Sequence, residues 1–216
     1  MKVIDPGFEI LTEISEDGIK ELQHIEKIAR RCYKSEDKIT EDGESAKKMV
    51  ANLIKRKHFA MIEHGSVSVL FTVDRGVSHE LVRHRMASFA QESTRYCNYA
   101  QGKFGGELTF IRPFFFTVED DPMKYGAWAT EMSSAEHTYL ELLKNGASPQ
   151  EARSVLPNSL KTEIIMTANY REWRHFFELR ALGITGQPHP QMKQVAVPLL
   201  REFQKRLPIL FDDLQV

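Results

Sequence analysis

The sequence is poor in several features that would by themselves identify the class of protein. Only two cysteines, Cys32 and Cys97, occur among 216 residues, so a disulfide-stapled secreted fold is not indicated. No apolar run approaches the length of a membrane span and no secretory leader is recognised, so we expect a cytoplasmic protein that binds no membrane. Lysine and arginine number 29 against 30 aspartates and glutamates, so any affinity for anions has to be local.

Two common nucleotide-binding signatures are also missing. The sequence contains neither a GxGxxG turn nor a P-loop, which argues against a Rossmann unit. His79-Glu80 begins like a zinc-protease motif, but that motif needs a second histidine at position 83, where arginine stands. We therefore expect no metal site.

Hydrophobic periodicity predicts a mixture of helices and strands. Strict alternation of Val67, Val69, Phe71 and Val73 predicts a half-buried strand, and 107–112 reads as a second one. Helical spacing predicts helices over 18–33, 44–57, 79–87, 122–144, 150–156, 171–182 and 189–207, while 161–168 fits either type. Ser78 is expected to cap the third helix, and Pro198 to kink the last. The predicted fold is α+β: one domain over residues 1–216, with a mixed sheet flanked by helices.

The most informative stretch is cationic. Arg83, His84, Arg85 and Arg95 lie within thirteen residues, with Glu92 as the only acid among them. Arginine offers a planar fork of donors that suits phosphate and carboxylate. On the predicted helix Arg83 and Arg85 would point in nearly opposite directions, serving two ligands or one bent ligand. A solvated basic face is the usual explanation of such a run, and an RNA- or nucleotide-binding module is the alternative from another class.

The order of motifs narrows these alternatives. Arg83-His84-Arg85, followed seven residues later by Ser93 and then by Arg95-Tyr96, resembles the signature of flavin-dependent thymidylate synthases. Three further blocks are similar to family blocks in the expected order: HFAMIEH (58–64), ARSVLP (152–157) and NYREWRHFFELR (169–180). The resemblance covers residues 28 to 180.

The resemblance implies an activity and a set of ligands. The enzyme would convert deoxyuridylate (dUMP) to thymidylate (dTMP), with 5,10-methylenetetrahydrofolate as carbon donor and NADPH as hydride source through FAD. It implies a homotetramer with shared active sites, no covalent protein nucleophile and no nucleic-acid partner. A flavin oxidoreductase with another acceptor is the nearest rival.

The resemblance also assigns residues. Flavin contacts fall on His58, Arg83, His84, Arg85, Gln91, Asn169, Arg171 and His175. Nucleotide contacts fall on Glu80, Arg83, Gln91, Glu92, Ser93, Thr94, Arg95, Arg153 and Arg180. Arg180 would be catalytic, because a guanidinium near N3 and O4 of uracil stabilises negative charge that develops there.

Several neighbouring residues are interpreted more plainly. Ser93 lacks the flanking glycines of a nucleophile elbow, and Cys97 is favoured as a small buried residue rather than a nucleophile. Arg174 is expected at solvent or an interface. The chain departs from the family pattern at Ala60, where a small hydroxyl residue is usual, and in the loop 181–191, where His189 and Gln191 stand.

Overall fold

The computed structural model describes residues 1–102 and 105–216, which cluster into two compact units. The first unit comprises residues 1–8, 70–83 and 89–165. The second comprises residues 9–69, 84–88 and 166–216. The chain passes from one unit to the other inside four strands, which therefore belong to both, and once more in the turn between residues 83 and 84.

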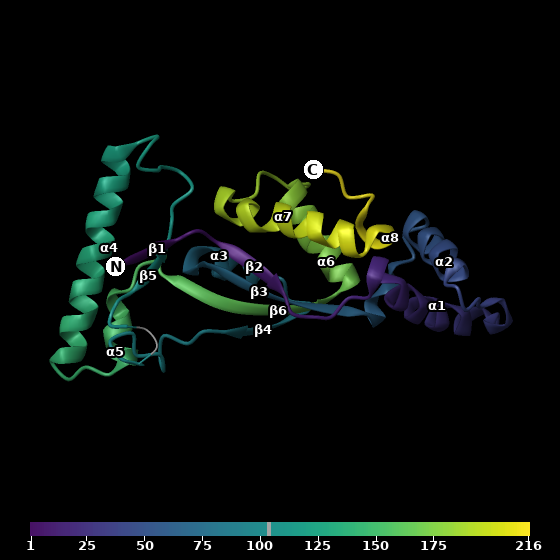
Figure 1. The fold of residues 1–216 in the computed structure, drawn as a ribbon, viewed down its shortest axis with the longest axis horizontal. Coiled ribbons are helices and arrows are strands. Elements are labelled where there is room, and N and C mark those ends of the chain that lie inside the picture. Colours follow the sequence, from purple (N-terminus) through teal and green to yellow (C-terminus); the bar gives the residue numbers. More distant parts are fainter. Residues whose placement is uncertain (103–104) are drawn as a thin grey trace. The chain divides into compact units, whose positions relative to one another are not determined.

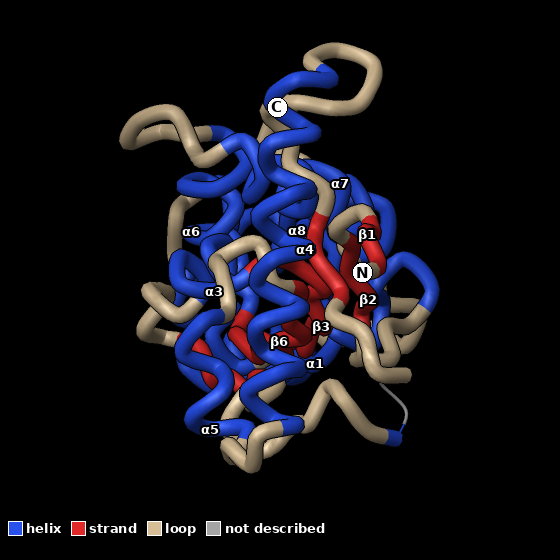
Figure 2. The backbone as a smooth tube through the Cα atoms, turned by 90° about the vertical axis from the view of Figure 1, so that its left-hand side faces the viewer, coloured by secondary structure: helices blue, strands red, loops and turns tan. Residues whose placement is uncertain are grey.

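The strands form two sheets (Figures 1 and 2). A two-stranded sheet pairs β1 (Lys2–Ile4) with β5 (Thr109–Ile111) in parallel, with Lys2 opposite Thr109. The second sheet has the order β2 (Gly7–Ile10), β3 (Ser66–Asp74), β6 (Lys161–Asn169) and β4 (Ala87–Gln91). The alternation predicted for 67–73 is confirmed, since all four apolar side chains of that strand are buried. The ambiguous segment 161–168 is a strand, in which every second residue from Thr162 to Ala168 is buried.

In the first unit, helices pack on a small apolar core. They are α4 (Pro122–Lys144), α5 (Pro149–Ala152) and the 3-10 turn η5 (Arg153–Val155). The same unit also contains α3 (Arg75–Leu81). The long helix α4 (Figure 1), predicted over the same residues, begins after an N-cap aspartate, Asp121. It buries Met132 and Tyr139 against Leu108, Phe110 and Leu160.

In the second unit, an aromatic cluster forms the core. The elements are η1 (Glu16–Gly18), α1 (Ile19–Tyr33), η2 (Glu36–Lys38), α2 (Glu44–Lys55), η3 (Phe59–His64), α6 (Tyr170–Phe177), the π-helix η6 (Glu178–Leu182), α7 (Pro190–Arg206) and α8 (Pro208–Phe211). The rings of Trp173, Phe176 and Phe177 on α6 pack against one another. Phe203 packs against Trp173 and Phe177, and Phe211 packs against Phe177 and Phe203. Helix α7 runs through Pro198 from Pro190 to Arg206.

The α+β class is confirmed, but the helix expected over 79–87 is wrong. Helix α3 begins at Arg75 and ends at Leu81, and residues 87–91 form β4. Its cap is Asp74, whose Oδ1 accepts a hydrogen bond from the Val77 amide at 2.8 Å, while the Ser78 hydroxyl donates to the Arg75 carbonyl. An aspartate at the end of β3 caps the helix four residues before the serine that was expected to do so. Arg83 and Arg85 therefore lie in turns, and their expected divergence around a helix does not apply.

Candidate functional site

The Arg83-His84-Arg85 triplet alternates between solvent and core. Arg83 and Arg85 are exposed, whereas only 4% of His84 is accessible. His84 lies against the Phe176 ring at 5.1 Å between centroids, in an edge-on arrangement, and 6.0 Å from that of His175. A histidine buried between two exposed arginines indicates an internal task for the imidazole and leaves ligand binding to the guanidinium groups.

Both ring nitrogens of His84 have partners within the second unit. Nδ1 lies 3.0 Å from a carboxylate oxygen of Glu172, and Arg180 Nε donates to Nε2 at 3.2 Å. An arginine Nε–H is always a donor, so Nε2 accepts, and the ring proton sits on Nδ1, where it is donated to Glu172. Both ring nitrogens of His84, for which a flavin contact is predicted, are thus engaged within the protein.

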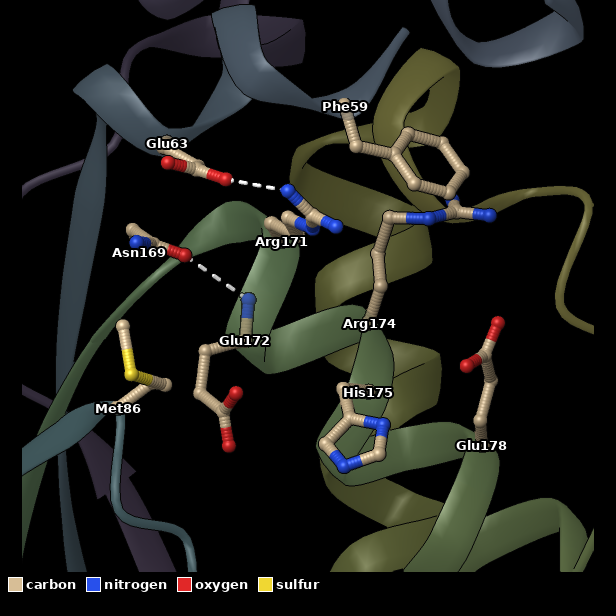
Figure 3. A pocket seen from close by; sticks show the side chains of 9 residues that line it. All are labelled: Phe59, Glu63, Met86, Asn169, Arg171, Glu172, Arg174, His175 and Glu178. Carbon is tan, nitrogen blue, oxygen red and sulfur yellow. Dashed lines mark hydrogen bonds and ion pairs between the residues drawn. The ribbon is translucent and has the colours of Figure 1, made fainter. Parts of the chain in front are cut away.

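Glu172 also lines a cavity of about 510 Å³. Figure 3 shows the side chains that line this cavity. Its lining residues come from η3, the turn at Met86, the end of β6, α6 and the start of η6: Phe59, Glu63, Met86, Asn169, Arg171, Glu172, Arg174, His175 and Glu178. Three predicted flavin residues, Asn169, Arg171 and His175, are thus brought to one wall. Arg171 and His175 share this wall because residues four apart lie on the same face of a helix, and Asn169 is the N-cap residue of the same helix.

Two of these residues also have structural partners (Figure 3). The Asn169 side-chain oxygen caps α6 by accepting from the Glu172 amide at 2.9 Å. Arg171 Nη1 meets a carboxylate oxygen of Glu63 at 2.5 Å, with both side chains largely exposed. An exposed ion pair of this kind contributes little stability and is easily exchanged for a ligand.

The expectation for Arg174 is wrong. Its guanidinium is buried and forms two hydrogen bonds to the carboxylate of Asp213, at 2.7 and 2.6 Å. Its Cζ also lies 5.1 Å from the centroid of the Phe59 ring (Figure 3). The cause is a long-range contact with the end of the chain, which local sequence does not reveal.

A second cavity of about 400 Å³ shares Phe59 and Arg171 with the first. His58 and Ala60 line it, together with Cys32, Tyr33, Leu53, Lys57 and Met61. His58 is exposed at the start of η3. The departure from the family pattern at Ala60 therefore lies in the wall of a cavity.

In the first unit, Gln91 has a fixed orientation. Its Nε2 donates to the hydroxyls of Ser78 and Thr162, at 2.9 and 3.2 Å. With both amide protons used, the carbonyl oxygen of Gln91 remains as an acceptor. Such a group recognises a ligand donor, such as a hydroxyl or the N3–H of a pyrimidine.

Glu92 is held within the protein. Its two carboxylate oxygens accept from the Tyr99 hydroxyl at 2.8 Å and from Lys161 Nζ at 2.9 Å. Burial, reinforced by the charge of Glu92, raises the pKa of Tyr99 well above its ordinary value. Burial lowers the pKa of Lys161, but its hydrogen bonds to Glu92 and Glu163 outweigh that effect and raise it. Neither Tyr99 nor Lys161 was singled out from the sequence.

The next residues form a turn that presents polar groups. The backbone carbonyl of Ser93 accepts from the amides of Tyr96 and Cys97, and Ser93 Oγ accepts from the Arg95 amide at 3.3 Å. Arg95 is exposed, with Nε donating to Gln150 on α5 at 3.1 Å. Thr94, by contrast, is buried, with 5% of its surface accessible.

The remaining predicted residues are placed as follows. Arg153 is exposed on η5, three residues after Gln150, and Glu80 lies near the end of α3. Cys97 packs partly buried against the apolar core of the first unit, in line with the interpretation made from the sequence. Glu172, which the sequence did not single out, carried no signal, because its contact with His84 spans 88 residues.

The fold and these sites define a class: an α+β protein whose arginine-rich turns and cavities suit phosphorylated, ring-bearing ligands. A family model described as thymidylate synthase complementing protein (Thy1) matches residues 17–209. The flavin-dependent thymidylate synthase of Corynebacterium aurimucosum is 31% identical over 218 residues, covering 94% of this chain and 84% of that protein. The one from Mycolicibacterium vanbaalenii is 30% identical over 208 residues, covering 89% and 79%. The chain belongs to the Thy1 family.

A solved structure has the same fold. The crystal structure of a UMP/dUMP methylase, PolB, from Streptomyces cacaoi bound with 5-Br dUMP superposes with a TM-score of 0.79. Identity is 22%, and the match covers 98% of this chain and 96% of that one. The arrangement of sheets and helices described above is thus that of a solved member of this fold. No helix in residues 1–102 and 105–216 is long and apolar enough to cross a membrane.

Proposed function

We propose that the protein is a flavin-dependent thymidylate synthase that methylates dUMP to dTMP. The observation that carries the proposal is the family match over residues 17–209, which includes all four sequence blocks on which the resemblance rests. Relatives with this activity in their names share about a third of their residues with the chain over most of its length.

The second unit has the chemistry to hold FAD. The two cavities offer apolar walls from Phe59, Met61 and Met86, against which a flat ring can pack. The exposed guanidinium of Arg171 lines both, and Arg85 is exposed one residue before Met86. Cations of this kind suit a diphosphate. We propose that FAD is held by His58, Arg85, Asn169, Arg171 and His175, with Arg83 and Gln91 as further contacts.

FAD supplies the redox chemistry, carrying the hydride of NADPH, since protein side chains do not transfer hydride. The protein contributes binding, orientation and electrostatics. 5,10-Methylenetetrahydrofolate is proposed as the carbon donor and NADPH as the reductant.

We assign the nucleotide to the turn at residues 91–95 and to the arginines. Arg95 and the Ser93 hydroxyl are suited to a phosphate, because both can donate to it. Gln91 offers a fixed acceptor, and Arg83, Arg153 and Glu80 are proposed as further contacts. Glu92 acts indirectly, since its carboxylate is held by Tyr99 and Lys161. Thr94 is buried and would contribute through its backbone.

Arg180 is the proposed catalytic residue. A guanidinium beside N3 and O4 of uracil stabilises negative charge on the base as it becomes a nucleophile at C5, without any covalent bond to the protein. We further propose that residues 1–216 form one catalytic domain, since the family match runs through both compact units. Assembly as a homotetramer with shared sites, in the cytoplasm, completes the proposal.

The direct test is product formation. Purified protein is incubated with dUMP, FAD, NADPH and 5,10-methylenetetrahydrofolate without oxygen, and dTMP is measured by chromatography. We expect dTMP only when all four are present. Product formation that does not depend on FAD would contradict the flavin, and NADPH oxidation without dTMP would favour an oxidoreductase with another acceptor.

A further inference from the structure

We propose that Glu172 is a positioning residue that orients Arg180 through His84. The inference rests on the proposed function in one respect: it assumes that Arg180 acts on the uracil base. Its structural part, a chain of contacts from Glu172 through His84 to Arg180, depends on no ligand.

The contacts that join Glu172, His84 and Arg180 matter because the first two side chains are buried. Glu172 is 8% accessible and His84 4%, so a polar atom that lost its partner here would be poorly solvated. Glu172 Oε1 faces Nδ1 of His84 at 3.0 Å, and Nε2 on the far side of the ring faces Arg180 Nε at 3.2 Å. The His84 ring thus links the Glu172 carboxylate on one side to the Arg180 guanidinium on the other.

The transmitted quantity is the ring tautomer. A carboxylate accepts hydrogen bonds but cannot donate them, so Glu172 holds the proton on Nδ1 and leaves the lone pair on Nε2. That lone pair accepts Arg180 Nε–H and fixes the direction of the guanidinium plane. If the proton moved to Nε2, two N–H groups would face each other and the arginine would have to turn away.

The neighbouring side chains hold this arrangement in place. Asn169 caps α6 by accepting from the amide of Glu172, which fixes the helix position that carries the carboxylate. Phe176 packs edge-on against the His84 ring at 5.1 Å between centroids and restrains its rotation. Arg180 follows in the π-helix η6, where an extra residue per turn changes the direction of the side chain.

The experiment compares Glu172→Ala, Glu172→Gln and a control, Glu202→Ala, which removes a partly exposed carboxylate on α7 that is paired with Arg206. Glutamine can still accept from Nδ1–H through its amide oxygen, whereas alanine cannot. We expect Glu172→Ala to lower kcat roughly tenfold with KM for dUMP nearly unchanged, the pattern of an interaction that matters in the transition state. The kcat of Glu172→Gln should stay within about threefold of the wild-type value, and the kcat of the Glu202→Ala control should equal the wild-type value.

A double variant tests whether the effect passes through Arg180. In the Arg180→Lys background, Glu172→Ala should lower kcat by less than about twofold, since coupled residues are not additive. A full tenfold loss in that background would overturn the proposal, as would wild-type kcat in Glu172→Ala.

A readout independent of activity separates this proposal from the assigned reaction. Nuclear magnetic resonance of ¹⁵N-labelled protein reports which ring nitrogen of His84 carries the proton, and the His84 signals are those that disappear in His84→Gln. They should show a protonated Nδ1 and an unprotonated Nε2. Glu172→Gln should retain this tautomer and Glu172→Ala should lose it. If the protein made no dTMP but showed this response, the reaction would be wrong and the positioning right. An unchanged His84 tautomer in Glu172→Ala would overturn the positioning.

Discussion

At the scale of single residues, the two predicted arginines with the clearest tasks differ in their surroundings. Arg95 is exposed, so its guanidinium is accessible to a phosphate, while Arg180 is half-buried and hydrogen-bonded to His84. The first should therefore contribute to binding, and the second to the chemical step.

Arg95→Ala should weaken dUMP binding by about 1.5–3 kcal/mol, the range for a hydrogen bond to a charged group. Calorimetric titration of the variant measures the change. Arg201→Ala, which removes an exposed arginine on α7, serves as the control and should leave the affinity unchanged. Equal affinities in all three proteins would remove Arg95 from the phosphate site.

Arg180→Lys should bind dUMP nearly as well as wild type but lose most of its turnover. Lysine keeps the charge but has neither the planar fork nor an Nε–H for His84. Single-turnover rates together with the dissociation constant distinguish the two effects. A variant with full turnover would show that a point charge is sufficient at this position.

Some residue roles were readable from sequence and others were not. The turn at 91–95 and the arginines on α6 and η6 belong to contiguous motifs, so their identity was visible in the chain itself. The internal tasks of His84, Glu92 and Arg174 were not, because their partners lie far away in sequence: Glu172, Lys161 and Asp213. Spacing within a motif says nothing about contacts of that kind.

At the scale of elements, the accuracy of a predicted helix start depended on identifying the residue that caps the helix. Periodicity located α1, α2 and α4 closely, since each has one apolar face. For α3 only Ser78 was expected from the sequence as the cap, whereas the structure uses Asp74. The short strands β1 and β2 were missed because three or four residues carry too little alternation to be recognised.

A close contact between Gly65, the residue before β3, and Tyr170 of α6 gives a test at this scale. A Cβ placed on Gly65 would lie 2.1 Å from the buried ring of Tyr170, whose amide also bonds to the Gly65 carbonyl. Gly65→Ala should therefore lower the free energy of unfolding by about 1–3 kcal/mol, the cost of overpacking. Urea denaturation provides the measurement.

Gly126→Ala is the matched control for that change. Gly126 lies within α4, where an added Cβ would meet nothing within 4 Å. The same substitution should here raise stability by roughly 0.5–1 kcal/mol, because alanine favours the helix. Equal effects at both positions would contradict the packing argument for Gly65.

At the scale of the whole molecule, buried tyrosines predict an alkaline limit to stability. Burial raises the pKa of Tyr99, Tyr139 and Tyr170, three of the six tyrosines, with Glu92 adding to the effect at Tyr99 and Glu21 at Tyr170. A group whose pKa is higher in the folded state contributes stability that is fully present below its unfolded pKa. That contribution is lost progressively as the pH rises from the unfolded pKa through the folded pKa. The free energy of unfolding should therefore fall as pH rises beyond about 10, the ordinary tyrosine value.

Urea denaturation at a series of alkaline pH values measures that fall, and spectrophotometric titration should show three tyrosines that ionise only as the protein unfolds. Tyr99→Phe should give a shallower decline than wild type, since one of the contributing groups is gone. Parallel declines in the two proteins would show that Tyr99 ionises freely in the folded state.

The central claim is that the protein binds both FAD and dUMP and that binding of dUMP changes the surroundings of the flavin. Its most direct test is the visible absorption spectrum of the purified protein reconstituted with FAD, recorded before and after addition of dUMP. We predict a bound-flavin spectrum that shifts on addition of dUMP and that shifts at higher dUMP concentrations in Arg95→Ala. A protein that retains no FAD, or whose flavin spectrum is indifferent to dUMP, would contradict the account.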